Sequence, residues 1–433
     1  MVIKTIKRGI HLKDKKESKE EKIKRIFPPW VILPLRQHIG APCKPLVKVG
    51  DKVEEGEKIA ESSSFVSSPI HSSISGKITA IKKIPHPLGG ENISILIERD
   101  KEERKNWENK NNKNLSELNS EEIRNKIQEA GIVGLGGAAF PTHVKLTPPP
   151  KKPINTVILN GCECEPYLTS DYRLMMERPD DCIYGLKIIM KAVKAKRGFV
   201  AIENNKSKAI TLIKEKLKKE KNIKIVSLKT KYPQGAEKML ISSILKKEVP
   251  SKGLPLDVGA VVDNVGTAVA ISEAIKWDKP LIERVITVSG SGIRRKVNLL
   301  VPIGTPLSYI IEKCGGLTGK VRKVIMGGPM MGIAQYTLDI PVIKGTSGIL
   351  ILSEEETRKA EEKPCIKCAR CVDHCPMGLL PTTLAHLVKK EKWEELEKYH
   401  IMDCIECGCC SYVCPSKIPL VQLIKQGKLH LQG

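Results

Sequence analysis

Eight cysteines near the carboxyl-terminal end of the chain are spaced in two matching runs, each closed by a proline. The first run comprises Cys365, Cys368, Cys371 and Cys375, and the second comprises Cys404, Cys407, Cys410 and Cys414. A [4Fe–4S] cube needs soft thiolates that converge from several sides, and the two-residue gaps allow one wrapped turn to supply three of them. The fourth cysteine of each run cannot easily reach the same cube, so we expect it to bind the other cluster.

This spacing is the one found in two-cluster bacterial ferredoxins. We therefore predict one cluster on Cys365, Cys368, Cys371 and Cys414, and a second on Cys404, Cys407, Cys410 and Cys375. Zinc also uses paired Cys-x2-Cys motifs, but eight cysteines in two complete runs make zinc improbable. Cys410 fits the two-residue gap after Cys407, whereas Cys409 does not. We therefore interpret Cys409 as a neighbour of the cluster ligands and not as a ligand. Two clusters whose ligands come from both cysteine runs must lie close together, an arrangement that is typical of proteins that conduct electrons.

A glycine-rich loop in the middle of the chain carries a second possible site. Gly134, Gly136 and Ala139 match the loose pattern of a dinucleotide-binding loop. That pattern should follow a strand and open a helix, whereas here a helical pattern with Ile123 and Ile127 on one face precedes it. The loop could still cradle a phosphate through its backbone N–H groups. From the spacing alone, a plain tight connection is an equally good interpretation.

An acidic loop, Asn160 to Pro166, follows a predicted strand. Glu163 and Glu165 alternate there with Cys162 and Cys164. Cys-x-Cys is too short to span a cube face, so we expect these two thiols to be packing or redox-inert groups. Carboxylates in a loop are usually solvated, and these residues alone assign no function.

The remaining pattern predicts several modules of the multidomain α/β class. Residues 31–98 read as short strands: Val47–Val49, Ile78–Ala80 and Ile93–Ile97. Strands then alternate with helices, which indicates a parallel sheet covered by helices, with binding loops at the carboxyl ends of the strands. The predicted strands are Thr156–Leu159, Phe199–Ile202, Ile223–Leu228 and Ala260–Val262, and the helices are Asp181–Lys194, Ser207–Lys218 and Gly235–Leu245. Residues 285–352 return to strands, with a helix at Leu307–Lys313.

Composition limits the partners and the location of the protein. The chain has 433 residues and a formal net charge of +24, which we interpret first as a lysine-rich solvated surface. Aromatic residues make up only 4% of the chain and form no basic stripe, so we expect no nucleic-acid partner. No stretch approaches the roughly 18 apolar residues of a membrane span. Met1–Gly9 is basic and lacks the apolar core of a secretory signal, which favours the cytoplasm or the cytoplasmic face of a membrane.

Several segments together resemble one family, the C subunit of the Rnf-type ion-translocating NADH:ferredoxin oxidoreductase. The segments that carry the resemblance are both cysteine runs and the strings LPLRQHIGAPCKPLVKVGDKV, AGIVGLGGAAFPTHVKL, NGCECEP and VVDNVGT. They occur in order over nearly the whole chain. The central part also resembles the flavin- and NADH-binding subunit of respiratory complex I.

The resemblance implies a division into modules. These are a barrel-sandwich module at 1–100 that is lipoyl-like but has no carrier lysine, a linker at 101–116, a Rossmann-like FMN- and NADH-binding α/β domain at 117–280, a β-grasp module at 281–352, and a helical two-cluster ferredoxin-like domain at 353–433. The lysine-rich run after Gly9-Ile10-His11 departs from the proline-containing string usual in the family. We assign no function to that run from the sequence.

The resemblance also implies roles for single residues. Those expected to bind the cofactor are Gly134, Gly136, Gly137, Lys145 (near the FMN phosphate), Asn160, Glu163 and Asn264, and those expected to act on NADH are Glu165 and Glu237. Gly235 matches a further position around the same site. Three residues depart from the complex I pattern, namely Leu135, Cys162 and Ala236. They put the handling of the nicotinamide in doubt more than flavin binding.

The resemblance implies an electron-input subunit that passes electrons between NADH, FMN and two [4Fe–4S] clusters. Its partners would be the membrane-spanning and ferredoxin-like subunits of the same complex, which couple electron flow to Na⁺ or H⁺ movement. The expected location is peripheral, on the cytoplasmic side of the inner membrane. Two alternatives stay open: a soluble flavin and iron–sulfur reductase of cobalamin, and an electron-transfer scaffold that has lost its flavin and NADH sites.

The cysteine register makes a testable prediction. Anaerobically purified protein should contain about eight iron atoms per chain, because eight thiolates are spaced for two cubes. Cys409→Ser should leave this iron content unchanged, because Cys409 lies outside the register. Loss of a whole cluster in Cys409→Ser, or stoichiometric zinc in place of iron in reconstituted protein, would contradict the assignment.

Overall fold

The first module of the chain is built from short antiparallel strands. The computed structural model describes residues 3–100, 105–108, 115–357 and 361–432. Two sheets, with strand orders β2-β8-β7-β4 and β3-β5-β6, enclose a core that includes Val31, Ile78 and Ile95. The strands are β2 (Trp30–Pro34), β3 (Lys44–Pro45), β4 (Lys52–Val53), β5 (Lys58–Glu61), β6 (Ile70–His71), β7 (Gly76–Pro85) and β8 (Glu91–Arg99).

Two of the three strands expected here are found within β7 and β8, but the strand expected at Val47–Val49 is wrong. The backbone N–H of Lys48 donates to the Asp51 carboxylate at 2.9 Å, which closes a turn at this place. The predicted linker falls mostly outside the described residues. Within its described part, the Trp107 indole N–H donates to the Glu55 carboxylate at 3.0 Å, so this side chain docks on the β module.

The second module is a four-stranded parallel sheet with helices on both faces. Its strand order is β11-β10-β9-β12, and all pairs are parallel, as the alternating pattern predicts. The strands are β9 (Thr156–Gly161), β10 (Arg197–Glu203), β11 (Ile223–Leu228) and β12 (Ala260–Asn264). The helices are α1 (Ser120–Glu129), α2 (Thr142–Lys145), α3 (Ser170–Glu177), α4 (Pro179–Ala192), α5 (Ser207–Lys216), α6 (Glu237–Leu245) and α7 (Val265–Trp277), with short 3-10 helices η1 (Leu115–Glu117) and η2 (Pro255–Val258).

Alternate residues of β9 explain how this sheet is covered. Val157 and Leu159 lie in the core that α4 and α7 share, whereas Ile158 packs on the opposite face with Leu240 and Ile241 of α6. A strand that is buried on both faces reads as a continuous apolar run, which is why β9 was visible in the sequence.

The third module is a six-stranded mixed sheet of order β1-β14-β13-β17-β15-β16. Its first strand comes from the beginning of the chain and pairs in parallel with β14, which joins the amino-terminal segment to this sheet. The elements are β1 (Ile23–Arg25), β13 (Glu283–Ser289), β14 (Val297–Pro302), α8 (Leu307–Lys313), β15 (Val321–Met326), β16 (Ile333–Gln335) and β17 (Gly348–Ser353).

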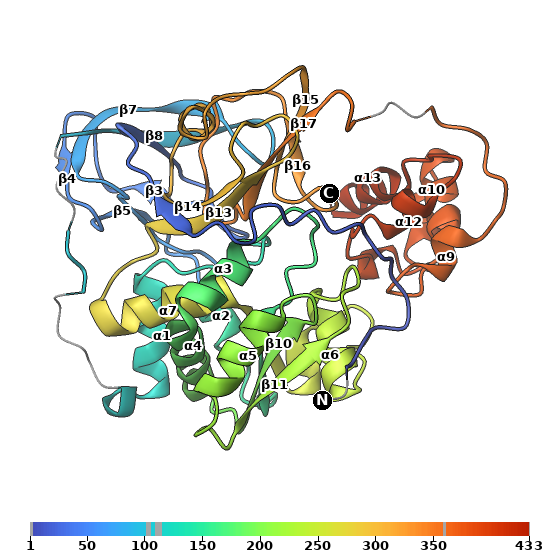
Figure 1. Cartoon of the computed structure of the whole chain (residues 1–433), viewed down its shortest axis with the longest axis horizontal. Coiled ribbons are helices and arrows are strands. Elements are labelled where there is room, and N and C mark those ends of the chain that lie inside the picture. The colour runs from blue at the N-terminus through green and yellow to red at the C-terminus, as the bar shows by residue number, and fades with distance from the viewer. Residues whose placement is uncertain (1–2, 101–104, 109–114, 358–360, 433) are drawn as a thin grey trace.

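The last module is a compact helical unit that carries both cysteine runs. Its elements are α9 (Arg370–Asp373), α10 (Pro381–Lys389), α11 (Trp393–Leu396), η3 (Ile401–Asp403), α12 (Cys409–Val413) and α13 (Leu420–Gln432). Figure 1 shows this unit beside the sheet modules, with the amino-terminal arm (residues 3–22) running between it and the α/β module. Among the described residues, no helix is long and apolar enough to cross a membrane.

A buried lysine connects the first three modules. Lys344, which is 1% exposed, lies just before β17, and its ammonium donates to the carbonyls of Pro69 at 2.7 Å and Gly131 at 2.6 Å. These carbonyls belong to the β module and to the entry of the glycine loop. The three modules therefore share a polar joint that fixes the glycine loop against its neighbours.

Candidate functional site

The glycine loop lies over the amino-terminal end of α7. The Leu135 N–H donates to the Thr267 hydroxyl at 2.9 Å, and the Gly134 N–H donates to the Phe140 carbonyl at 2.8 Å, which closes the loop. Gly136 and Gly137 are exposed. Among the described residues, neither of their N–H groups has a protein acceptor. An exposed loop with free N–H groups at a helix amino terminus is suited to a phosphate or a flavin.

Asn264 forms the floor beneath this loop. It caps α7 by accepting the Gly266 N–H at 2.7 Å, and its amide donates to the Asp171 carboxylate at 2.7 Å. A Cβ atom on Gly136 would lie 3.5 Å from the Asn264 Cβ atom, which is an ordinary contact. The protein itself therefore leaves room for a small side chain at Gly136.

Lys145, expected near a phosphate, is paired with Glu237, expected to act on NADH. The Lys145 ammonium donates to the Glu237 carboxylate at 3.0 Å and to the Val262 carbonyl at 2.7 Å, and it lies 4.0 Å from the Asp263 carboxylate. Burial raises the pKa of Asp263 to about 6, with Lys145 opposing the shift. A phosphate at this place would compete with Glu237 for the same ammonium.

The two carboxylates of the acidic loop point in different directions. Glu163 turns towards α3, where it accepts the N–H groups of Asp171 at 2.8 Å and Tyr172 at 3.3 Å. Glu165 accepts the N–H groups of Met330 at 3.0 Å and Met331 at 2.9 Å, in the loop between β15 and β16. In this conformation both carboxylates bind protein N–H groups, Glu163 on α3 and Glu165 in the loop between β15 and β16.

Asn160 holds the same loop from its other end. Its amide donates to the Gly235 carbonyl at 2.9 Å, and its oxygen accepts the Cys162 N–H at 3.1 Å. Burial raises the pKa of Cys162 and raises that of Cys164 to about 12, so both thiols stay protonated at neutral pH. This agrees with the expectation that they are packing groups.

Sequence reasoning missed Asp171, which lies between the two loops. Burial raises the pKa of Asp171 to about 7, and the nearby Glu163 adds to the shift. It lies in the first turn of α3, a helix that the sequence pattern did not predict, and it gave no functional signal. Asp263 follows the predicted strand Ala260–Val262, at a strand end where binding loops are expected, but no role was assigned to it.

Four thiols of the second predicted cluster surround one cavity. Cys375, Cys404, Cys407 and Cys410 all line it, together with Cys409. The pKa of Cys410 is raised to about 12 by burial and by the charges of the other three predicted ligands. The backbone N–H of Glu406 also donates to the Cys404 sulfur at 3.4 Å. The chain thus brings together the four cysteines that the spacing assigns to this cluster.

The cysteines of the first predicted cluster lie on the outer side of this module. Cys371 and Cys414 share one buried apolar group, whereas Cys365 and Cys368 are exposed. The Ser416 hydroxyl donates to the Pro364 carbonyl at 2.8 Å, which holds the start of the first run beside the end of the second.

The described side chains do not offer a site for a single metal ion. Among the described residues, no three His, Cys, Asp or Glu side chains converge as the ligands of one ion would. A zinc ion draws four sulfur atoms to about 2.3 Å. In a cube the thiolates bind different iron atoms, so a cluster does not require three thiolates to converge on one point.

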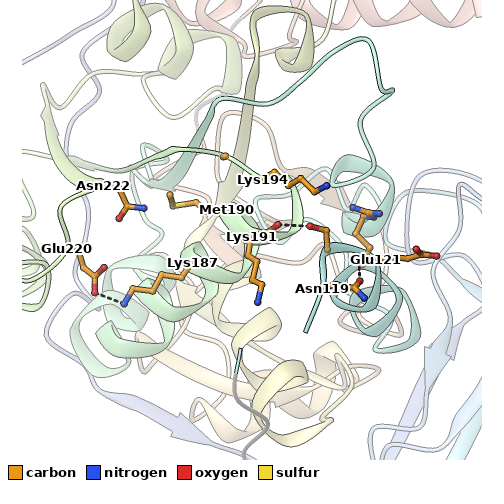
Figure 2. A pocket seen from close by; sticks show the side chains of 11 residues that line it. Asn119, Glu121, Lys187, Met190, Lys191, Lys194, Glu220 and Asn222 are labelled. Atoms are coloured by element: carbon orange, nitrogen blue, oxygen red, sulfur yellow. Dashed lines mark hydrogen bonds and ion pairs between the residues drawn. The ribbon is translucent and has the colours of Figure 1, made fainter. Parts of the chain in front are cut away.

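A separate hollow of the described surface is remote from these groups. It has a volume of about 920 Å³ and lies beside the start of α1 and the carboxyl-terminal half of α4, next to Glu220 and Asn222. Figure 2 shows that an ion pair between Lys187 and Glu220 crosses part of it. Because it borders the segment that enters β11, it lies at the end of the sheet opposite the glycine and acidic loops.

The fold and these sites define a modular electron-transfer protein with a flavin-type domain and an iron–sulfur domain. Four family profiles match the chain. They are the RnfC barrel sandwich hybrid domain (residues 4–102), the Nuo51 FMN-binding domain (127–273), the SLBB domain (285–334) and the 4Fe-4S dicluster domain (364–418).

Relatives match over almost the whole length. The C subunit of the proton-translocating ferredoxin:NAD(+) oxidoreductase complex of Clostridium ljungdahlii is 48% identical, covering 98% of this chain and 93% of the relative. The Na(+)-translocating counterpart of Acetobacterium woodii is 45% identical, covering 99% and 97%. The chain belongs to the family of C subunits of the Rnf-type ion-translocating ferredoxin:NAD⁺ oxidoreductase complexes.

A solved structure is similar in fold. The NAD⁺-reducing [NiFe]-hydrogenase in its H2-reduced state matches with a TM-score of 0.52 and 17% identity, covering 75% of this chain and 65% of that chain. At this identity the likeness concerns the fold alone.

The raised pKa of Asp171 predicts a pH-dependent stability. Its folded pKa of about 7 lies above the ordinary value of 3.8, so the native state loses stability as the pH rises between these values. Asp171→Asn removes this loss and should stabilise the folded state more at pH 8 than at pH 5.5, by a difference on the order of 1 kcal/mol in the free energy of unfolding, which also appears as a larger rise in Tm at pH 8.

The matched control for this prediction is Asp180→Asn, which removes an exposed carboxylate of α4. Thermal unfolding of cofactor-free protein at the two pH values measures the effect. A Tm change in Asp171→Asn that is the same at both pH values would contradict the account.

Proposed function

We propose that this chain is the electron-input subunit of a membrane-bound, ion-translocating NADH:ferredoxin oxidoreductase, and that the cluster on Cys375, Cys404, Cys407 and Cys410 exchanges electrons directly with the flavin site. When bound, FMN exchanges a hydride with the nicotinamide and single electrons with the clusters. The protein residues supply the orientation, the burial and the charges around these groups.

One observation carries this proposal: the acidic loop and the ligand loop of the second cluster both contribute to the apolar cluster around Tyr232, which lies between β11 and α6. The Tyr232 hydroxyl donates to the Cys407 carbonyl at 2.8 Å. Tyr232 and Cys407 belong to one apolar cluster against which Cys164 and Met330 also pack. Short packed distances favour electron transfer, and here Cys164 of the acidic loop packs against the same apolar cluster as the predicted ligand Cys407.

The loop between β15 and β16 completes the junction. Met330 and Met331 are held by Glu165, and the Met330 carbonyl oxygen lies 3.3 Å from the position that a Cβ atom on Gly408 would take. Gly408 stands between Cys407 and Cys409. Glu165 therefore supports the cluster loop through its partner residues, in addition to any contact with a nucleotide.

The same proposal covers the flavin residues and the finer fold labels. Gly134, Gly136, Gly137 and Asn264 would line the flavin, and Lys145 would exchange Glu237 for the FMN phosphate. Glu165 and Glu237 would reach NADH only after leaving their present partners. We assign the α/β module as Rossmann-like and the 281–352 module as β-grasp, on the basis of the parallel sheet and of the mixed sheet with its single helix.

Partners and location follow from the relatives' names. The names of the Clostridium and Acetobacterium relatives describe complexes that translocate protons and Na⁺ respectively, so the coupling ion differs within the family. We propose a peripheral position on the cytoplasmic side of the inner membrane, bound to membrane-spanning and ferredoxin-like subunits. The exposure of Cys365 and Cys368 supports the approach of such a partner to the first predicted cluster.

The flavin assignment is tested by Gly136→Val. Gly136 has room for a Cβ atom, so the variant should fold, whereas a branched side chain in the cradle should exclude FMN. We expect at least tenfold weaker FMN binding, about 1.4 kcal/mol, with iron content and Tm unchanged. Normal FMN binding and NADH turnover in the folded variant would refute the cradle, and wild-type protein without FMN affinity would favour the scaffold alternative.

The junction is tested by Tyr232→Phe. This change removes one hydroxyl and should preserve the iron content, but it should alter the EPR signal of one cluster and slow its reduction from NADH several-fold. Tyr309→Phe is the matched control, because its hydroxyl also donates to a backbone carbonyl, that of Phe27 at 2.7 Å, away from both sites. Identical EPR spectra and reduction rates in Tyr232→Phe and wild type would argue against a direct junction.

A further inference from the structure

The amino-terminal arm follows an extended path across three modules. Lys4 bridges to Leu228 at the edge of the α/β sheet, and Ile10 pairs with Tyr232. The Gly9 N–H donates to the His374 carbonyl of the cysteine-rich module at 3.2 Å. The lysine-rich run then passes the acidic loop before β1 joins the mixed sheet (Figure 1).

One lysine of this run is inserted into the acidic loop. The Lys16 ammonium donates to the carbonyls of Glu163 at 2.8 Å and Glu165 at 2.7 Å, and also to that of Leu168. Its side chain is only 9% exposed. Burial lowers the pKa of Lys16, with Glu163 opposing the shift, but three carbonyl acceptors require three N–H bonds, which only the ammonium form has.

A second buried lysine holds the loop from another side. The Lys206 ammonium, whose side chain is 2% exposed, donates to the Cys162 carbonyl and to the Glu203 carboxylate at 2.8 Å. Glu163 has a φ of +44°, a left-handed conformation that is unfavourable for a residue with a side chain. The lysine contacts on both sides of Glu163 offset this cost.

The two lysines also determine which groups the loop leaves available. In a trans peptide, the N–H of one residue points away from the carbonyl of the residue before it. Because the carbonyls of Cys162 and Glu163 face the lysines, the N–H groups of Glu163 and Cys164 point away from them. Among the described residues, neither N–H has a protein acceptor. The loop therefore presents two donors and a nearby positive charge to a ligand.

We propose that Lys16 is a positioning residue for the flavin site: its ammonium holds residues 163–168 in the ligand-binding conformation and adds positive charge beside the bound flavin. This inference rests on the proposed function, because it assumes that the acidic loop contacts FMN. The lysine-rich run thus contributes one specific side chain to the site, that of Lys16. The adjacent Lys15 of the same run serves as the control residue.

The test compares Lys16→Met with Lys15→Met. Methionine keeps the apolar length of lysine and removes its charge. Lys15 is adjacent in the arm; its ammonium pairs with Glu356 and lies over the Tyr167 ring, and it donates to none of the loop carbonyls that Lys16 binds. We expect Lys16→Met to weaken FMN binding about tenfold, to lower the flavin midpoint potential, and to speed amide hydrogen exchange in residues 162–168 of cofactor-free protein. Lys15→Met should leave FMN binding, the midpoint potential and exchange in residues 162–165 unchanged, because its side-chain contact in this segment is with the Tyr167 ring.

The readouts separate this inference from the proposed function. Wild-type FMN affinity, midpoint potential and exchange in folded Lys16→Met would overturn the role of Lys16. Equal effects in Lys15→Met and Lys16→Met would also overturn it, because they would show only that the arm is an anchor. If wild-type protein binds no FMN, the proposed flavin function fails, and exchange in residues 162–168 still decides whether Lys16 positions the loop. If Lys16→Met does not fold, Lys16→Gln replaces it in the same measurements.

Discussion

The burial of the acidic loop is the constraint on which the rest of the structure depends. Burying charged and backbone polar groups costs several kcal/mol unless each has a partner. The loop meets this demand with groups from distant segments: Lys16 from the arm, Lys206 beyond β10, and the N–H groups of Met330 and Met331. Because each partner belongs to a different part of the chain, satisfying one loop also fixes the arrangement of the modules.

The same principle acts at the glycine loop, where Lys344 joins three modules through backbone carbonyls. Its ammonium is fully buried, and burial lowers the pKa of Lys344 to about 7. A lysine can bond carbonyls of several modules at once because its ammonium is a compact donor of three hydrogen bonds on a flexible stem. The large positive charge of the chain is therefore not only a solvated surface, since Lys16, Lys206 and Lys344 act as internal connectors.

Local patterns in the sequence predicted the local parts of the structure. Apolar runs identified β9 to β12, and helix α8 was predicted with its observed bounds, Leu307–Lys313. The cysteine spacing grouped Cys375 with Cys404, Cys407 and Cys410, and all four line one cavity. Such signals depend on residues that are close in the sequence, or on a metal whose ligand geometry is known in advance.

The missed features depend on contacts between residues that are far apart in the chain. No periodicity indicates that Lys16 binds the carbonyl of Glu163, or that Glu165 accepts the N–H of Met330. The turn of Glu163 towards α3 was equally invisible, because a carboxylate in a loop gives the same signal whether it caps a helix or binds a ligand. The family resemblance supplied the expected site residues but not the protein partners that occupy their carboxylates.

Under the proposed function, these occupied carboxylates link the flavin side of the loop to its cluster side. Glu165 is bound to Met330 and Met331, and Met330 packs against the apolar cluster that contains Cys407 and Cys409. A ligand that draws the Glu165 carboxylate away from these N–H groups would remove the support of Met330 beside Cys407. Burial raises the pKa of Glu165, and the two N–H donors oppose that shift by stabilising the charged form. Under the same proposal, occupation of the nucleotide side and support of the cluster side are linked through one carboxylate.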